Sequence, residues 1–263
     1  MVLLSHLNLS NVDNTEFNRD SSYALYMSQE HDCSYLPEKT ARTLFLDPSV
    51  RVNPALYQFL IDRGFRRSGH YLYQPACSRC EACVSLRLPV RDFSPNRSQR
   101  RNWRLNQERI AIQAQPAVFS EAHFELYKRY QEARHADGAM TCVEPEQYMQ
   151  FLTCQWADTR FYEFHLQREL VAVVVTDLLP DGLSAVYTFY DPVREADGLG
   201  VYALLWQLRH AQELGKRWVY PGYWVKGSDK MDYKSRYRPL EAWNGKNWKR
   251  FSRDEPIELQ SGA

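Results

Sequence analysis

The sequence predicts an α+β fold in two parts, and three observations support this. Three apolar segments with strand character follow one another in the second half: Arg160–Leu166, Val171–Leu178 and Ala185–Tyr190. A helical segment, Val201–Leu214, then precedes a further strand at Trp218–Tyr220. Residues 91–109 shift in composition to Arg, Asn, Ser and Gln, which marks a seam. We therefore expect a Cys-bearing N-terminal domain at residues 1–96 and a second domain at residues 97–263. The order of elements in the second domain is typical of the acetyltransferase-like (GNAT-like) acyl-transfer fold.

In the N-terminal part, the polar stretch up to about Gln29 is expected to be a loosely attached arm or an edge element. A helix is predicted at Pro54–Arg63. Asn53 can cap this helix, Pro54 suits its first position and Gly64 can end it.

A hairpin is predicted next, with Tyr71 and Tyr73 before its turn and alternating apolar residues at 86–90 after it. The turn holds a C-x2-C-x2-C run: Cys77, Cys80 and Cys83. Such spacing lets the sulfurs point into one small volume, as a zinc ion or an iron–sulfur cluster requires. Cys33 is the natural fourth ligand, with His31 and His70 as alternatives. Small buried thiols without a metal, or a single catalytic thiol, are the other interpretations.

The seam carries a dense basic segment with one tryptophan: Arg97, Arg100, Arg101, Trp103 and Arg104. Arginine binds phosphate in a bidentate manner, and planes of Arg or Trp stack on unpaired bases. The segment is therefore a candidate for binding the acceptor end of a tRNA. The alternative is a solvated helix start on a linker.

The second half is expected to begin with helices at Glu121–His135 and Pro145–Cys154. Pro180-Asp181-Gly182 forms a turn between two of the strands. A loop at Asp191–Gly200 leads into the later helix, which Gly215 can end.

Composition narrows the class of protein. Of the 263 residues, 44% are hydrophobic and 25% are charged, which fits a globular domain rather than a disordered chain. The net charge of +1 neither demands nor excludes a nucleic-acid partner. We see no apolar run of about 18 residues and no secretory signal at the start, so we expect a cytoplasmic protein with no membrane partner. Its 6 Cys should then be reduced.

Several segments together resemble a known family. They are His31–Pro37 with the later cysteine run, Ser98–Arg101, Asp191-Pro192, Leu199–Tyr202, Gly222–Lys234 and Arg236–Glu241. They resemble the arginyl-tRNA–protein transferase family, and most closely its short bacterial branch, the aspartate/glutamate leucyltransferases. The resemblance covers the chain from about Asp32 to Glu241.

This resemblance implies a leucyl-tRNA or arginyl-tRNA donor and an acceptor protein that begins with Asp or Glu. The product would be a degradation signal in the N-degron pathway. No DNA partner and no cofactor for the transfer itself are implied. Eukaryotic relatives can hold an iron–sulfur cluster, partly through a C-x2-C near the position of Cys33. Leu36 replaces the second of those cysteines here, and the later cysteine run is longer.

The implied chemistry is aminolysis of an ester, in which an α-amine with a pKa of about 7.7–8.0 attacks the aminoacyl carbonyl. Holding the two substrates together is the main requirement. An acidic acceptor calls for facing cations, and the residues we assign to substrate binding are Lys226, Lys230, Tyr233, Lys234, Arg236 and Arg238. The same cations could instead hold tRNA phosphates. Asp191 and Tyr187, or Tyr190, are candidate catalytic groups near the amine, although Asp191-Pro192 is equally a turn signal.

Three other functions remain open from the residues alone. Arginine could replace leucine as the transferred residue. The chain could be an acyl-CoA-dependent N-acyltransferase, with Asp197–Gly200 holding a diphosphate at a helix N-terminus. It could also be a zinc-knuckle RNA-binding protein without activity, which would not explain the Lys- and Tyr-rich segment at residues 223–234.

Overall fold

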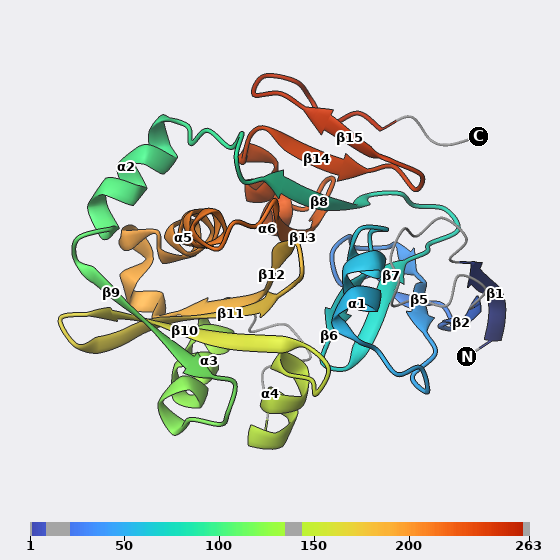
Figure 1. Cartoon of the computed structure of the whole chain (residues 1–263), viewed down its shortest axis with the longest axis horizontal. Coiled ribbons are helices and arrows are strands. Elements are labelled where there is room, and N and C mark those ends of the chain that lie inside the picture. The colour runs from blue at the N-terminus through green and yellow to red at the C-terminus, as the bar shows by residue number, and fades with distance from the viewer. Residues whose placement is uncertain (1, 9–21, 135–143, 260–263) are drawn as a thin grey trace.

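The computed structural model describes residues 2–8, 22–134 and 144–259. A large mixed sheet forms the body of the molecule, and a smaller sheet lies at one end beside it, together with the N-terminus (Figure 1). The smaller sheet has five strands, in the order β1 (Val2–Asn8), β2 (Ser22–Met27), β5 (Thr43–Leu46), β7 (Tyr71–Pro75) and β6 (Arg66–Ser68). A separate pair joins β3 (His31–Asp32) to β4 (Thr40–Ala41). Since β1 is an edge strand, the edge-element interpretation of the N-terminal stretch is confirmed for the residues described.

The large sheet has eight strands. Their order is β15 (Trp248–Phe251), β14 (Leu240–Trp243), β8 (Cys83–Pro89), β13 (Trp218–Val225), β12 (Gly182–Tyr190), β11 (Glu169–Leu178), β10 (Asp158–Leu166) and β9 (Ile110–Pro116). All neighbours are antiparallel except β12 and β13, which are parallel and are connected through helix α5 (Leu199–Glu213). The predicted succession of three antiparallel strands, a helix and a strand is therefore confirmed.

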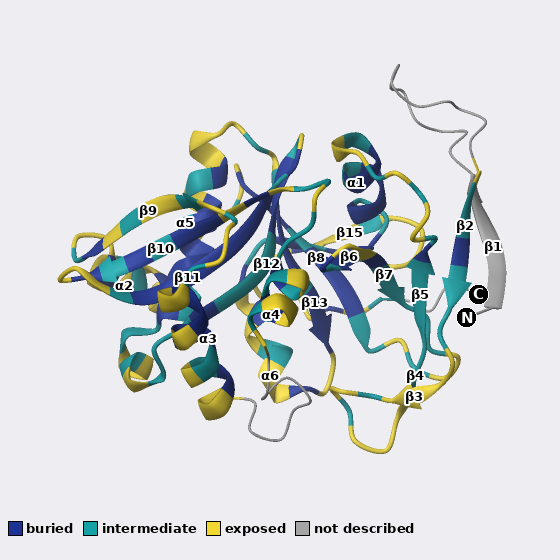
Figure 2. Cartoon of the chain, turned by 90° about the horizontal axis from the view of Figure 1, so that it is seen from below, coloured by how far each residue is buried: buried dark blue, intermediate teal, exposed yellow. Residues whose placement is uncertain are grey.

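Both faces of the large sheet are covered by helices, so its central strands are buried (Figure 2). Helix α5 packs on one face, against Tyr162, Phe164 and Val174. Helices α3 (Glu121–Arg134) and α4 (Pro145–Leu152) pack on the other face, against Phe161 and Val175. Successive side chains on a strand point to opposite faces, which is why neighbouring residues serve different cores. His135, the expected end of α3, lies outside the described residues.

The predicted hairpin between Tyr71 and Val90 is wrong. β7 pairs with β5 and β6 in the small sheet, whereas β8 pairs with β13 and β14 in the large sheet. The alternating pattern identified each strand correctly but holds no information about its partner. As a result, the first 96 residues contribute a central strand to the large sheet. The weakly apolar edge strand β9 was not predicted.

Local signals fixed the helix ends well. Helix α1 (Pro54–Ile61) is capped by Asn53, whose Oδ1 accepts from the backbone N–H of Leu56 at 2.8 Å. Gly64 follows the helix with a φ of +87°, a conformation that favours glycine. Helix α2 (Arg97–Asn106) begins with a capping box between Asn96 and Gln99.

A buried ion pair joins the two sheets. Arg67 of β6 donates to both carboxylate oxygens of Asp177 on β11, through Nε at 2.5 Å and Nη2 at 2.6 Å. The carboxylate also accepts from the Tyr57 hydroxyl at 2.8 Å and the Thr159 hydroxyl at 2.7 Å. Asp177 is fully buried, so its charge is neutralised by protein groups alone. A buried pair of this kind is costly to break, because the remaining charge has no partner.

We expect Asp177→Asn to lower the free energy of unfolding by about 3–5 kcal/mol, because it leaves the Arg67 guanidinium buried without its counter-ion. The measurement is urea unfolding followed by fluorescence. Asp92→Asn is the matched control, since its ion pair with Arg250 is about half exposed on both sides and should contribute less than about 1 kcal/mol. Equal, small losses in both variants would contradict the assigned role of the junction.

Candidate active site

The two parallel strands of the large sheet separate soon after they pair. β12 and β13 share three residue pairs, Gly182 with Trp218, Leu183 with Val219 and Ser184 with Tyr220. Beyond these pairs, β12 continues to Tyr190 and β13 to Val225 without further pairing between them. Each strand also has a register irregularity near this point, relative to its other neighbour. Backbone groups and side chains of both strands therefore become available in the opening, which we call the strand-parting site.

Tyrosines gather at the strand-parting site. Tyr187 comes from β12, Tyr223 comes from β13, and Tyr35 lies near enough to both to add to the rise of their pKa values, which burial mainly causes. Gln131 Nε2 donates to the Tyr187 hydroxyl at 3.0 Å. Burial raises the pKa of Tyr187 far above its ordinary value, so this hydroxyl stays protonated at neutral pH. It can donate a hydrogen bond, but it cannot serve as a base.

The Lys- and Tyr-rich segment after β13 lies beside the same opening. It forms α6 (Asp229–Asp232) and a 3-10 turn η2 (Tyr233–Arg236), and both contact β13. Lys226, Lys230 and Arg236 are exposed to solvent. Arg238 instead holds the loop together, because its guanidinium donates to the carbonyls of residues 235 and 252 at 2.7 Å and 3.1 Å. Tyr233 is 42% exposed and interacts electrostatically with Tyr190.

Lys234 differs from the other cations because it is buried. Only 8% of the residue is exposed, and its Nζ donates to the backbone carbonyl of Tyr223 at 2.9 Å. Burial, followed by the positive charge of Arg66, lowers the pKa of Lys234 to about 7. No sequence pattern distinguishes this lysine from its neighbours or indicates that Arg66 lies near it.

Asp191 lies at the end of β12, as expected, but its carboxylate has a structural partner. Oδ1 accepts from the backbone N–H of Val193 at 3.2 Å and caps the 3-10 turn η1 (Pro192–Asp197). Oδ2 lies 3.8 Å from Arg129. The turn interpretation of Asp191-Pro192 is therefore confirmed, and a catalytic role for Asp191 stays a prediction.

The four cysteines of the expected metal site gather in one region. Cys33, Cys77 and Cys80 each interact electrostatically with Cys83, and burial is the main cause that raises the pKa of the Cys83 thiol to about 12. Among the described residues, however, no group of three or more His, Cys, Asp or Glu side chains is arranged to hold a metal ion. His70 instead lines a separate pocket of about 130 Å³ with Leu72 and Trp156. The residues as placed do not fit a metal, and metal binding stays a prediction.

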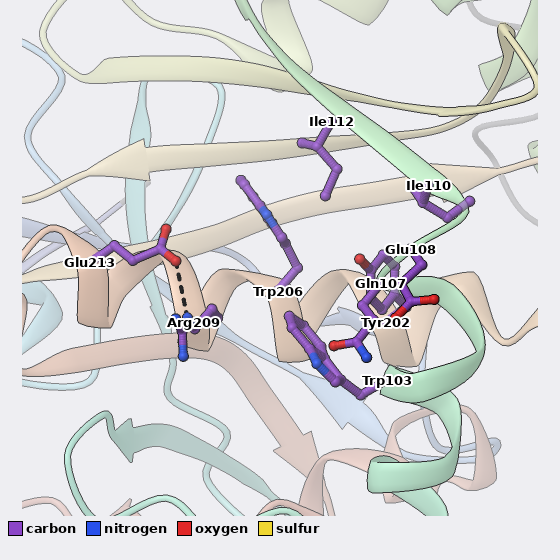
Figure 3. Close-up of a pocket in the computed structure, with 9 residues that line it drawn as sticks. All are labelled: Trp103, Gln107, Glu108, Ile110, Ile112, Tyr202, Trp206, Arg209 and Glu213. Atoms are coloured by element: carbon purple, nitrogen blue, oxygen red, sulfur yellow. Dashed lines mark hydrogen bonds and ion pairs between the residues drawn. The ribbon is translucent and has the colours of Figure 1, made fainter.

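The arginines of α2 form an exposed basic surface: Arg97, Arg100, Arg101 and Arg104. Trp103 is half-buried, with its ring centroid 5.3 Å from that of Tyr202. It also lines a pocket of about 580 Å³ between α2, β9 and α5. Figure 3 shows the Trp206 side chain extending from α5 toward Ile112 of β9, while Trp103 reaches from α2 toward α5. Basic and aromatic groups therefore lie together on this face of the molecule.

The segment suggested for a diphosphate is packed against protein. Asn102 Nδ2 donates to the carbonyls of Asp197 and Gly198, both at 3.1 Å. On the other side, a Cβ added to Gly200 would lie 3.3 Å from the Tyr190 ring. The Asp197 carboxylate is paired with Arg109 at 2.6 Å. Because side chains flank the first turn of α5, the arrangement does not favour an acyl-CoA site there.

Comparison with known proteins defines the class of enzyme to which the chain belongs. The model described as "Arginine-tRNA-protein transferase, N terminus" matches residues 31–101, and the corresponding C-terminus model matches residues 122–244. The two matches cover the cysteine region, the first half of α2, β10–β13 and the Lys- and Tyr-rich segment. This class of enzyme is an aminoacyltransferase that uses a charged tRNA.

Relatives narrow the assignment. Over 225 residues the chain is 52% identical to the aspartate/glutamate leucyltransferase of Pseudomonas fluorescens (strain Pf0-1), a match that covers 85% of this chain and 94% of the relative. It is 50% identical to the protein of that name from Pseudomonas aeruginosa (strain LESB58), with the same coverage. The chain belongs to the arginine-tRNA–protein transferase family.

Among solved structures, a match is entitled "The structure of L-PGS from Bacillus licheniformis". The sequence identity is 13% and the TM-score is 0.42, over 64% of this chain and 49% of the other. Within the described residues, no helix is both long enough and apolar enough to cross a membrane.

The lowered pKa of Lys234 predicts a pH-dependent stability. The folded pKa of about 7 lies below the ordinary 10.5, so between these values the unfolded chain binds a proton that the folded chain does not. The contribution of Lys234 to stability therefore improves as the pH rises through this window. Relative to Lys234→Met, the wild-type protein should gain about 2 kcal/mol in unfolding free energy between pH 7 and pH 9. Urea unfolding of both proteins at the two pH values measures the gain; equal changes would contradict a buried, readily deprotonated lysine.

Proposed function

We propose that this chain transfers leucine from leucyl-tRNA to the N-terminal Asp or Glu of acceptor proteins, and so creates an N-degron. The observation that carries the proposal is the 52% identity to a relative named aspartate/glutamate leucyltransferase, over 94% of its length. Arginine is the alternative donor residue, because the matching family models are described as arginine-tRNA-protein transferase. We place the reaction in the cytoplasm, where charged tRNA is available.

We further propose that the C-terminal part is a GNAT-like transfer domain and that the strand-parting site is its active site. The order of β10, β11, β12, α5 and β13, with a parallel pair that separates, supports this proposal. Backbone groups left without a strand partner in the opening are available to hold an extended acceptor peptide. Positioning of amine and ester is the largest contribution that such a site can make.

Tyr187 is proposed to donate a hydrogen bond to the oxyanion that forms when the α-amine attacks the ester carbonyl. Its hydroxyl stays protonated because burial raises its pKa, and Gln131 fixes its position. The tetrahedral intermediate then collapses, the bond to the ribose oxygen of the tRNA breaks, and the proton lost by the amine ends on that oxygen. Asp191, directly after the end of β12, is retained as a candidate for orienting the amine.

The tRNA is proposed to lie across α2. Its arginines are exposed, and in the described part of the chain Arg97 and Arg101 have no hydrogen-bond or ion-pair partner. The neighbouring pocket with Trp103 and Trp206 offers aromatic faces to an unpaired base. A structural or regulatory zinc ion or iron–sulfur cluster at the four cysteines beside the active site is proposed on the condition that the thiols rearrange, because as placed they do not form a ligand set. The transfer itself does not need this metal.

The transfer assay is the direct test. Labelled leucyl-tRNA or arginyl-tRNA is incubated with peptides that begin with Asp, Glu or Ala. We expect leucine on the Asp and Glu peptides only. Arginine transfer instead would keep the reaction and change the donor. No transfer from either tRNA by folded protein would refute the proposed function.

The basic surface of α2 makes a separate prediction. The double variant Arg97→Glu/Arg101→Glu should weaken leucyl-tRNA binding at least about 10-fold at low salt and reduce its salt dependence, because two phosphate contacts are lost. Acceptor binding should not change. Arg51→Glu/Lys246→Glu, which changes two exposed cations outside α2, is the charge-matched control. Filter binding over a range of salt concentrations measures the effect; equal losses in control and variant would mean that general charge, not α2, binds the tRNA.

A further inference from the structure

Two buried cations at the strand-parting site have no acidic partner among the described residues. Arg66 is 5% exposed and Lys234 is 8% exposed. In the described part of the chain, neither side chain forms an ion pair with a carboxylate. The charged group that influences the pKa of Lys234 is Arg66, and its positive charge lowers that pKa further. Buried charges in proteins are normally paired, because desolvation penalises an isolated one heavily.

The hydrogen-bond partners of Arg66 are neutral groups, so they fix the position of the guanidinium without neutralising its charge. Its guanidinium donates to the carbonyls of Phe65 at 2.6 Å, Leu86 at 2.8 Å and Ile61 at 3.3 Å. It also lies over the rings of Tyr220 and Tyr223, at 5.4 Å and 5.7 Å from their centroids. Its Nε is buried and has no hydrogen-bond partner in the residues that the structure describes. The next residue, Arg67, has the full counter-ion that Arg66 lacks.

The ammonium group of Lys234 has free donors and a small space beside it. Its Nζ uses one of its three N–H groups to donate to the Tyr223 carbonyl, so two N–H groups are left for a ligand. A Cβ added to Gly222 would lie 3.4 Å from this Nζ, and the glycine has a φ of +87°. The absence of a side chain at Gly222 therefore leaves space next to the ammonium group. Gly222 lies in the part of β13 that no longer pairs with β12. Lys234 follows in η2, and its hydrogen bond to the Tyr223 carbonyl holds it beside that part of the strand.

We propose that Lys234, supported by the charge of Arg66, binds the side-chain carboxylate of the acceptor's N-terminal Asp or Glu. This inference rests on the proposed function and assigns its acceptor specificity to one buried site. The ligand then supplies the negative charge that the folded protein lacks here. Asp and Glu differ by a single methylene, and a lysine on a flexible stem accommodates both.

A tRNA phosphate is the less suitable occupant. Phosphates are held by arginines and lysines that reach into solvent, and the protein has such residues on α2 and at Lys226 and Lys230. The ammonium group of Lys234 is buried beside a strand backbone, where a side-chain carboxylate on an extended peptide can reach it. A buried site also distinguishes Asp from Asn strongly, because the low local dielectric enlarges the effect of charge.

The test compares Lys234→Met with the wild-type protein on peptides that differ only in the first residue. We expect kcat/KM for Asp and Glu peptides to fall about 100-fold, with little change for Asn and Gln peptides, so that the preference for acidic residues is lost. The KM for leucyl-tRNA should not change. Lys246→Met, an exposed lysine in the β14–β15 turn, is the control and should behave as wild type.

A second variant guards against misfolding. Lys234→Gln keeps a donor for the Tyr223 carbonyl without the charge, and it should also lose the preference for Asp over Asn. A raised KM for leucyl-tRNA with the preference intact would overturn the proposal in favour of a phosphate. An equal loss on all peptides would overturn it in favour of a general catalytic or structural role.

Peptide binding without tRNA separates this proposal from the proposed function. Wild-type protein should bind a fluorescent Asp peptide at least about 10-fold more tightly than its Asn counterpart, and Lys234→Met should not. If that preference holds while no transfer from any tRNA occurs, the proposed function fails and the carboxylate site stands. If transfer occurs but Lys234→Met keeps the preference for Asp, the site fails and the function stands.

Discussion

The ion pair between Arg67 and Asp177 determines how the two sheets lie against each other. One carboxylate on β11 collects donors from α1, β6 and β10, so three elements from different parts of the chain converge on a single charge. Because a buried charge tolerates little displacement from its partners, this junction fixes the small sheet against the large one. The same placement positions the residues next to Arg67 in sequence, Arg66 among them, beside β13.

Arg66 and Arg67 illustrate how strand geometry separates two identical side chains. Successive residues on a strand point to opposite faces, so one guanidinium reaches Asp177 while the other lies over Tyr220 and Tyr223. The first completes the structural junction. The second introduces an unneutralised charge into the region where the parallel strands separate. The ion pair of Arg67 with Asp177 thus holds β6 in a position that also buries Arg66. Arg66 is buried at the strand-parting site, where a ligand can supply the anion that it lacks.

The predictions from sequence succeeded where the signal was local. Capping residues located α1, and short apolar segments with strand character located β10, β11 and β12, because these patterns depend on neighbours a few residues away. The partner of a strand depends on contacts between distant residues, which is why β7 and β8 were wrongly joined. For the same reason Lys234 could not be distinguished from Lys226 or Lys230. Nothing in the run of charged residues indicates which side chain folds inward.

A cation near the strand-parting site can distinguish an acidic from a neutral acceptor residue strongly only if it is buried. An exposed lysine interacts with a carboxylate in water, where the attraction is weak and salt screens it, so the exposed members of the segment can contribute only modestly to acceptor choice. At Lys234 solvent is largely excluded, and the same attraction is several times stronger. In the protein without a ligand, this burial destabilises the charged form of Lys234 and so lowers its pKa. A bound carboxylate would stabilise the charged form. A neutral Asn side chain could not stabilise the charged form in this way. The loss of stability caused by the buried lysine and the selectivity for an acidic acceptor therefore have the same physical origin.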